Sequence, residues 1–231
     1  MNETTQSIAI DGPAGAGKST IAKRVAAGLG FAYVDSGAIY RTCALYFVEK
    51  FAADSRGAVE DPVRLAAEID NFDIGFVVTE KLDFKVLLNG RDVSGRIRTQ
   101  EVSRFVPEVA SRIPVRDKVN KRLREFAATH RVVMDGRDIG TCVLPASRLK
   151  VFLTASPEVR AERRLRELIE KNEKATFEAV YKDVVERDRM DETRPVAPLV
   201  KAGDAVEVDS TAMNIDQVVS TILDLSRERF K

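Results

Sequence analysis

A glycine-rich loop between an apolar segment and a helical pattern constrains this chain most. Residues 12–19 have the sequence GPAGAGKS, which fits the pattern G-x-x-x-x-G-K-[ST]. The apolar run 7–10 precedes the loop, and residues 18–29 follow it with a helical period of apolar residues. Gly30 is the expected C-terminal stop of this helix. Glycines let a backbone turn its N–H groups inward around a phosphate, and the helix N-terminus adds a positive dipole end. The pattern therefore predicts a strand–loop–helix unit that holds a phosphate.

The loop residues have distinct expected roles. Lys18 is suited to place a point charge on the β and γ phosphates of a nucleotide, and the Ser19 hydroxyl is suited to ligate Mg²⁺. An incidental glycine-rich turn is the structural alternative. The residues expected to bind the phosphate donor are Gly12, Pro13, Ala14, Gly15, Ala16, Gly17, Lys18, Ser19 and Thr20.

The composition narrows the class of protein. The 231 residues include 37 Lys and Arg and 36 Asp and Glu, a net charge of +1, which excludes a chain-wide basic coat for nucleic acid. No apolar run is long enough for a membrane helix. Cys43 and Cys142 are far apart and are expected to be the reduced thiols of a cytoplasmic protein. A single histidine, His130, argues against a His-built metal site or triad, and we expect it in a surface loop.

Strands and helices alternate along most of the chain. Further strands are expected at residues 31–34, 131–134, 149–153 and 205–208. Further helices are expected after Asp35-Ser36, which is suited to cap the helix, after Ser156-Pro157 and from about Asn214. This alternation predicts a parallel sheet with helices on both faces. Residues 72–93 differ, because two β-rich segments and the turn signal Asn89-Gly90 predict an inserted antiparallel piece.

Arginines cluster where two phosphates would have to meet. Arg137 lies in the segment Asp135-Gly136-Arg137-Asp138 after a predicted strand, at the sheet edge where α/β proteins bind ligands. Arg187 and Arg194 follow a charged helix. Because phosphoryl transfer depends on positioning and charge neutralisation, these arginines and the phosphate loop indicate a small-molecule kinase.

Several candidates keep a structural alternative. Asp135 is either a turn residue or a Mg²⁺-water ligand. Asp138 either pairs with Arg137 or another arginine, or accepts an exocyclic amine. Tyr40 is either a core aromatic residue or a site residue. Residues 96–124 carry nine basic and three acidic side chains, which could form a nucleic-acid stripe. Because no aromatic platform accompanies them, a pocket for a small anion explains the charge with fewer assumptions.

Five blocks of the sequence, in order, resemble the bacterial cytidylate kinase family. They are residues 8–19, Asp35-Ser36-Gly37-Ala38-Ile39-Tyr40-Arg41, Arg98-Thr99-Gln100-Glu101-Val102, Asp135 to Thr141, and the tail with Arg187, Asp188, Asp191, Arg194 and 197–199. The resemblance implies an α/β P-loop fold with a five-stranded parallel sheet flanked by helices. It also implies one kinase domain (1–231), an inserted antiparallel monophosphate-binding subdomain at about 60–98 and a helical lid at about 156–195.

The resemblance further implies transfer of a phosphoryl group from ATP to CMP or dCMP with Mg²⁺. A cytoplasmic monomer without nucleic-acid or membrane partners is expected. The implied catalytic residues are Lys18, Arg137, Arg187 and Arg194, and the implied metal-site residues are Ser19 and Asp135. The implied acceptor-binding residues are Ser36, Tyr40, Arg41, Arg116, Arg137, Asp138, Asp191 and Arg194.

Individual roles follow from the same resemblance. Arg41, Arg137 and Arg194 would contact the acceptor phosphate. Asp138 would accept the cytosine amino group, Arg116 would meet the pyrimidine edge, and Asp191 would hold the sugar hydroxyls. Arg187, with lid arginines near Arg163 and Arg164, would neutralise the transferring group.

One position departs from the family pattern. Pro107 stands where the family has a serine that touches the base, and Ser103 or Ser111 is a candidate substitute. The alternatives in function are a kinase for UMP or shikimate and, from another class, a nucleotide-dependent RNA-binding protein that uses residues 96–124.

Overall fold

The computed structural model describes residues 6–79, 84–170 and 172–231. The described residues form two compact units. The first unit is Ala32–His130, and the second combines Gln6–Phe31 with Arg131–Lys231.

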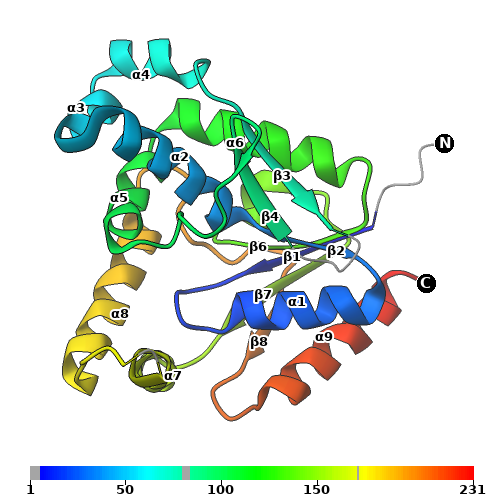
Figure 1. The fold of residues 1–231 in the computed structure, drawn as a ribbon. Coiled ribbons are helices and arrows are strands. Elements are labelled where there is room, and N and C mark those ends of the chain that lie inside the picture. The colour runs from blue at the N-terminus through cyan, green and yellow to red at the C-terminus, as the bar shows by residue number, and fades with distance from the viewer. Residues whose placement is uncertain (1–5, 80–83, 171) are drawn as a thin grey trace. The chain divides into compact units, whose positions relative to one another are not determined.

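A five-stranded sheet and a three-stranded sheet carry the fold (Figure 1), with strand orders β2-β6-β1-β7-β8 and β3-β4-β5. The second unit contains β1 (Ser7–Asp11), α1 (Lys18–Leu29), β6 (Val132–Asp135), a π-helical turn (Ile139–Val143), β7 (Leu149–Thr154), α7 (Pro157–Glu170), α8 (Phe177–Thr193), β8 (Val206–Asp209) and α9 (Ile215–Arg229). The first unit contains β2 (Ala32–Asp35), α2 (Ser36–Phe51), a 3₁₀ turn (Ala52–Asp54), α3 (Ser55–Glu60), α4 (Pro62–Ile69), β3 (Ile74–Val78), β4 (Phe84–Leu88), β5 (Arg91–Asp92), α5 (Gln100–Ala110) and α6 (Ile113–Ala127). The expected α/β class, with its five-stranded parallel sheet and antiparallel insertion, is confirmed.

The register of the central strands positions the site. β1 pairs in parallel with β6, with Ile10 beside Asp135, and with β7, with Ile10 beside Val151. Parallel strands end at the same edge of a sheet, so Asp11 and Asp135 both stand at the carboxyl edge from which the phosphate loop departs. Ile8 and Ile10 are fully buried, as expected for a central strand covered on both faces.

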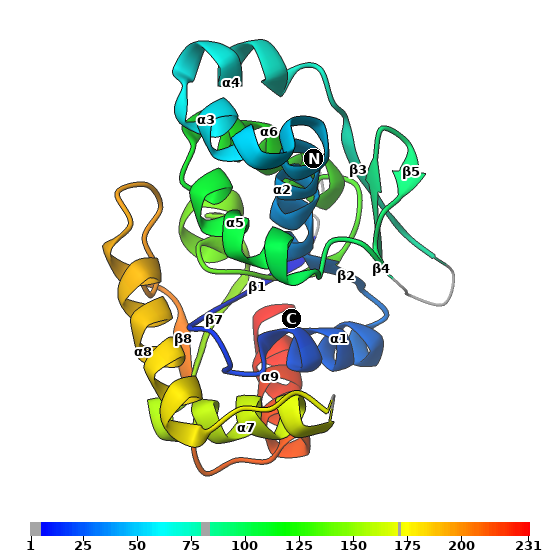
Figure 2. The same cartoon turned by 60° about the vertical axis from the view of Figure 1, so that its left-hand side comes forward.

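Helices of the second unit pack against one another in pairs. α1 and α9 lie side by side in both views (Figures 1 and 2), and Gly28 of α1 lies close to Leu223 of α9. α7 packs on α8 around Ala161, Val180 and Val184. Gly30 ends α1 in the left-handed conformation, as its position after the apolar pattern predicts.

In the first unit, β3, β4 and β5 form an antiparallel sheet that Figure 2 shows beside the α2 helix. Asn89 and Gly90 both have positive φ, 49° and 76°, and join β4 to β5 in a tight hairpin. This confirms the turn predicted from the Asn-Gly pair. Asp35 caps α2 by accepting the Ala38 N–H across 2.9 Å, again as predicted.

The structure also bears on the remaining general expectations. No helix in the described ranges is long and apolar enough to cross a membrane. Cys43 and Cys142 are both free thiols. His130 is exposed and stacks on Phe126, which confirms its predicted place at the surface.

The predicted subdomain at about 60–98 falls within the first unit, and the predicted lid at about 156–195 falls within the second. The functions of both segments remain proposals.

Candidate active site

The phosphate loop has a backbone that only glycine permits at its first position. Gly12 has φ of 147°, and a Cβ there would lie 2.0 Å from the Leu153 carbonyl oxygen of β7. Gly15 and Gly17 also have positive φ, 76° and 86°, and both are exposed. Gly17 immediately precedes the first residue of α1, so the N-terminus of that helix opens into the loop. This arrangement suits an anion held by backbone N–H groups.

Lys18 is a buried cation at the centre of this loop. Its side chain is 6% exposed, and its Nζ donates to the Pro13 carbonyl across 2.7 Å. Burial, and next the Arg137 charge, hold the Lys18 pKa well below its usual value, while Asp135, Asp11 and Asp191 oppose that shift. Lys18 forms no ion pair with any residue in the described ranges. A bound phosphate would supply the missing negative charge.

Ser19 and Asp135 fit a magnesium site. The Ser19 Oγ donates to Asp135 Oδ2 across 2.9 Å, and Asp135 is the buried last residue of β6. Mg²⁺ usually takes one or two protein oxygens and completes its shell with water and phosphate. No cluster of three acidic, histidine or cysteine side chains suited to a metal occurs among the described residues.

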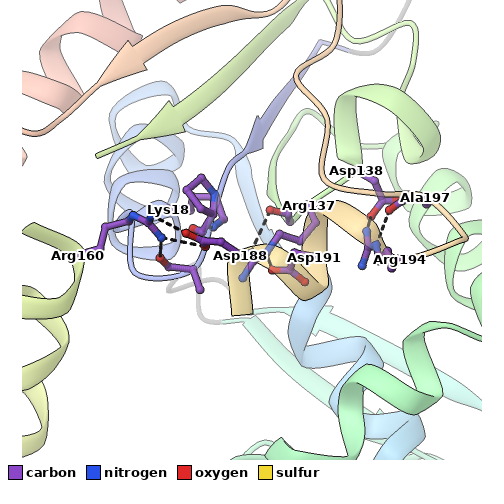
Figure 3. A network of polar contacts seen from close by, with 11 residues as sticks. Lys18, Arg137, Asp138, Arg160, Asp188, Asp191, Arg194 and Ala197 are labelled. Carbon is purple, nitrogen blue, oxygen red and sulfur yellow. Dashed lines mark hydrogen bonds and ion pairs between the residues drawn. The ribbon is translucent and has the colours of Figure 1, made fainter. Parts of the chain in front are cut away.

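Arg137 and Asp138, which follow β6, both pair with the α8 region. Arg137 Nε donates to Asp191 Oδ2 across 2.7 Å, and Arg194 donates to Asp138 Oδ1 across 3.2 Å (Figure 3). The structural alternative for Asp138, a pair with another arginine, is thus present in this structure, and the partner is Arg194. These two ion pairs bring four of the predicted site residues together.

Asp11 is a site residue that the sequence analysis missed. Its carboxylate accepts the N–H groups of Ile139 and Gly140 across 2.8 and 2.7 Å, and it thereby holds the π-helical turn beside the phosphate loop. Burial raises the pKa of Asp11, and the two N–H bonds work in the opposite direction. π-Helical turns are often found at functional sites. An acidic residue within an otherwise apolar strand was the available signal.

Arg187 of α8 makes no hydrogen bond or ion pair with residues in the described ranges. Although the residue keeps exposed surface, desolvation of its guanidinium and the Arg137 charge lower its pKa. The expected lid arginines have other partners, since Arg163 donates to Ser210 and Arg164 to Glu167. Arg160, which was not predicted, is instead buried and bonded to the phosphate loop.

The remaining acceptor candidates lie in the first unit. Tyr40 is 8% exposed, with its hydroxyl 3.5 Å from Asn120, and the Arg116 guanidinium lies 5.5 Å from the centre of its ring. Arg116 is itself buried and donates to the Ala110 carbonyl. Ser36 is the buried first residue of α2. The structure thus brings Tyr40 and Arg116 together. The burial of Tyr40 agrees with a core aromatic residue, and its role as a site residue stays a prediction.

Arg41 donates to Ser103 Oγ across 2.7 Å, which places a hydroxyl next to a predicted phosphate ligand. Pro107 is exposed within α5, and Ser111 donates to the Glu108 carbonyl. Arg41 and Ser103 lie in the first unit, whereas Arg137 and Arg194 lie in the second. Their convergence on one acceptor phosphate therefore stays a prediction.

The comparison with family profiles and the comparison with related sequences agree on one family. A family profile described as cytidylate kinase matches residues 8–228. The cytidylate kinase of Thermosipho melanesiensis is 42% identical over 224 residues, 97% of this chain and 98% of its own. That of Shouchella clausii is 46% identical over 222 residues, 96% of each chain. A solved structure of an uncharacterised protein from Eubacterium ventriosum, at 12% identity, covers 97% of this chain and 99% of its own with a TM-score of 0.50, which bears on the fold alone. By its sequence, the chain belongs to the cytidylate kinase family.

Proposed function

We propose that this protein transfers the γ-phosphoryl group of ATP to CMP or dCMP, giving ADP and CDP or dCDP. The observation that carries the proposal is the buried Lys18, which stands at a helix N-terminus without an anionic partner among the described side chains. Membership of the cytidylate kinase family supplies the acceptor class.

The chemistry needs little from the protein besides position and positive charge. An oxygen of the acceptor phosphate forms a bond to the γ phosphorus as the bond between that phosphorus and the bridging oxygen of ADP breaks. Because the acceptor oxygen is already anionic, no strong general base is required. Lys18 and Arg187 are placed on elements of the same unit and would neutralise the charge of the transferring group.

Base selection is assigned to Asp138 and Arg116. Cytosine presents an amino donor that a carboxylate accepts well, whereas uracil presents an acceptor oxygen there, which a carboxylate would repel. Asp138 is buried and its Oδ1 already bonds Arg194, so one carboxylate would serve both the base and a phosphate-binding arginine. Asp191 would hold the sugar hydroxyls, and Ser36, Tyr40 and Arg41 would complete the acceptor site.

Ser19 and Asp135 would hold Mg²⁺ together with oxygens of ATP. When bound, the ion would neutralise charge on the β and γ phosphates and orient them. The 2.9 Å contact between the two side chains supports this assignment, since both oxygens then face one small volume.

We further propose a cytoplasmic monomer in which residues at about 60–98 serve the acceptor and those at about 156–195 form a lid. Free thiols at Cys43 and Cys142 are compatible with a reducing compartment. Nucleic acid is not proposed as a partner, because three of the nine basic side chains in 96–124 already pair with carboxylates of the first unit and a fourth, Arg116, is buried. Arg96, Arg98 and Arg122 pair with Glu49, Asp35 and Asp73.

A coupled assay of ADP release tests the proposal with CMP, dCMP, UMP, AMP and shikimate as acceptors. The expected result is turnover with CMP and dCMP that exceeds turnover with the other three. Preferential turnover of UMP or shikimate would overturn the acceptor assignment. RNA affinity that falls steeply with salt, without acceptor-dependent ADP release, would favour the RNA-binding alternative.

A further inference from the structure

A buried arginine outside the predicted set lies between the phosphate loop and α8. Arg160 belongs to the first turn of α7 and is only 3% exposed. Its Nε donates to the Ala155 carbonyl across 2.9 Å, and one terminal nitrogen donates to the Ala14 carbonyl across 3.0 Å. Both terminal nitrogens also bond the Asp188 carboxylate, at 2.9 and 2.6 Å (Figure 3). Four of the five guanidinium N–H groups thus donate to partners within the protein.

The contact with Ala14 determines where the next N–H points. The Ala14 carbonyl and the Gly15 N–H belong to the same planar trans peptide, so they face opposite directions. A carbonyl held by Arg160 therefore turns the Gly15 N–H away from Arg160. Gly15 also lies against this side chain, because a Cβ added there would be 3.3 Å from the Arg160 Cβ.

The Ala14–Gly15 peptide needs a partner outside the loop to stop it from rotating. Gly15 has φ of 76° and is exposed, and a glycine reaches the opposite sign of φ at little cost. Without a partner for the Ala14 carbonyl, the peptide is free to rotate and to present its oxygen, rather than its N–H, to a phosphate. A carbonyl oxygen would repel that anion.

We propose that Arg160, held by Asp188, is a positioning residue that keeps the Ala14–Gly15 peptide oriented with its N–H toward the phosphates of ATP. The inference rests on the proposed function and deepens it on the donor side. Asp188 follows Arg187 in α8, so the same ion pair also fixes the helix segment that carries this proposed catalytic arginine. A lysine at position 160 could not take over this role, because a single ammonium nitrogen cannot bond the Ala14 carbonyl and both Asp188 carboxylate oxygens at once.

Kinetics of the full-length protein test the role of Arg160 through Arg160→Gln, Arg160→Lys and Asp188→Asn. For Arg160→Gln we expect the KM for ATP to rise about tenfold or more, from the loss of a charge-assisted hydrogen bond. The KM for CMP should stay within about twofold, because Arg160 bonds none of the residues proposed to bind the acceptor. Arg160→Lys and Asp188→Asn should also raise the KM for ATP while the KM for CMP stays nearly constant, but the rise should be smaller.

Matched controls come from an exposed ion pair on α8, the helix that carries Asp188. Arg189 and Glu186 pair at the surface of α8, so Arg189→Gln and Glu186→Gln remove the same chemical groups without touching the phosphate loop. Both controls should keep the parental KM values. Equal rises in the KM for ATP and CMP in the Arg160 variants, or an unchanged KM for ATP, would overturn the proposal. If Arg160→Gln does not fold, Arg160→Lys and Asp188→Asn decide by the same criterion.

A direct probe of the peptide separates this inference from the proposed function. In a nitrogen-15 spectrum, titration with inorganic tripolyphosphate should shift the Gly15 amide resonance strongly in the parent protein and weakly in Arg160→Gln. An equal shift in both proteins would contradict a positioning role. This readout needs no turnover, so it still tests Arg160 if the acceptor assay shows that CMP is not the substrate.

Discussion

Arg137 Nε donates to Asp191 Oδ2 across 2.7 Å, so two residues assigned to the acceptor nucleotide are bonded to each other in this structure. Each side chain is about 20% exposed, which leaves the pair open to exchange with a ligand. The Asp191 carboxylate occupies a donor of Arg137 that an acceptor phosphate would need. We therefore expect nucleotide binding to replace this ion pair with one contact to phosphate and another to sugar.

The variant Asp191→Ala should separate those two contacts. Removal of the carboxylate frees Arg137, so the affinity for inorganic sulfate should rise severalfold. The KM for CMP should nevertheless rise about tenfold, because a sugar contact is lost. Calorimetric titration with sulfate and steady-state kinetics with CMP measure the two effects. Weaker sulfate binding in the variant would argue that Asp191 does not compete for Arg137.

Lys18→Ala should abolish most turnover without loss of fold. Removal of a charge that stabilises the transferring phosphate is expected to lower kcat at least about a hundredfold. The free protein should melt at the same temperature or higher, because Lys18 is a buried cation whose pKa burial depresses. Coupled ADP release and thermal unfolding check the two expectations. Near-normal turnover in a folded variant would contradict the phosphate role.

Gly12→Ala should destabilise the protein by about 3 kcal/mol or more, because the new methyl group would collide with the Leu153 carbonyl at a φ unfavourable for alanine. Gly95→Ala is the matched control, since a Cβ there meets nothing within 4 Å and its φ is not positive. Chemical denaturation measures both variants. Similar losses in the two would show that strain at Gly12 is not the cause.

Features set by near neighbours were predictable from the sequence, and features set by distant partners were not. The Asp35 cap and the Asn89-Gly90 turn depend on residues within a few positions, so local chemistry predicts them. Arg160 stands in a helix rich in both signs of charge, where nothing local distinguishes one buried guanidinium from solvated neighbours. Asp11 accepts backbone N–H groups from residues 128 and 129 positions further along the chain, and the periodicity of the sequence does not predict such a contact.

Cys43 should be unreactive in the folded protein while Cys142 reacts. Burial raises the pKa of Cys43 from 9.0 to about 12, so at about pH 8 almost none is thiolate, whereas Cys142 is partly exposed. A chromogenic disulfide reagent should therefore titrate one thiol in buffer and two in denaturant. In Cys142→Ala, rapid labelling without denaturant would contradict the burial of Cys43.

The raised pKa of Cys43 also makes stability depend on pH. The folded state holds the Cys43 proton more tightly than the unfolded state, so this thiol's contribution to the free energy of unfolding is complete below pH 9 and is lost as pH rises toward 12.

Asp138→Ala should change selectivity as well as rate, and the two effects are separable. Loss of the carboxylate leaves Arg194 without its 3.2 Å partner, which affects every nucleoside monophosphate alike. Loss of the acceptor for the cytosine amino group affects CMP alone, so the ratio of kcat/KM for CMP to that for UMP should fall about ten- to a hundredfold. Arg194→Ala is the matched control, and it should depress both substrates while the ratio stays constant. If Asp138→Ala also leaves the ratio unchanged, the carboxylate serves only to hold Arg194, and the base must be recognised elsewhere.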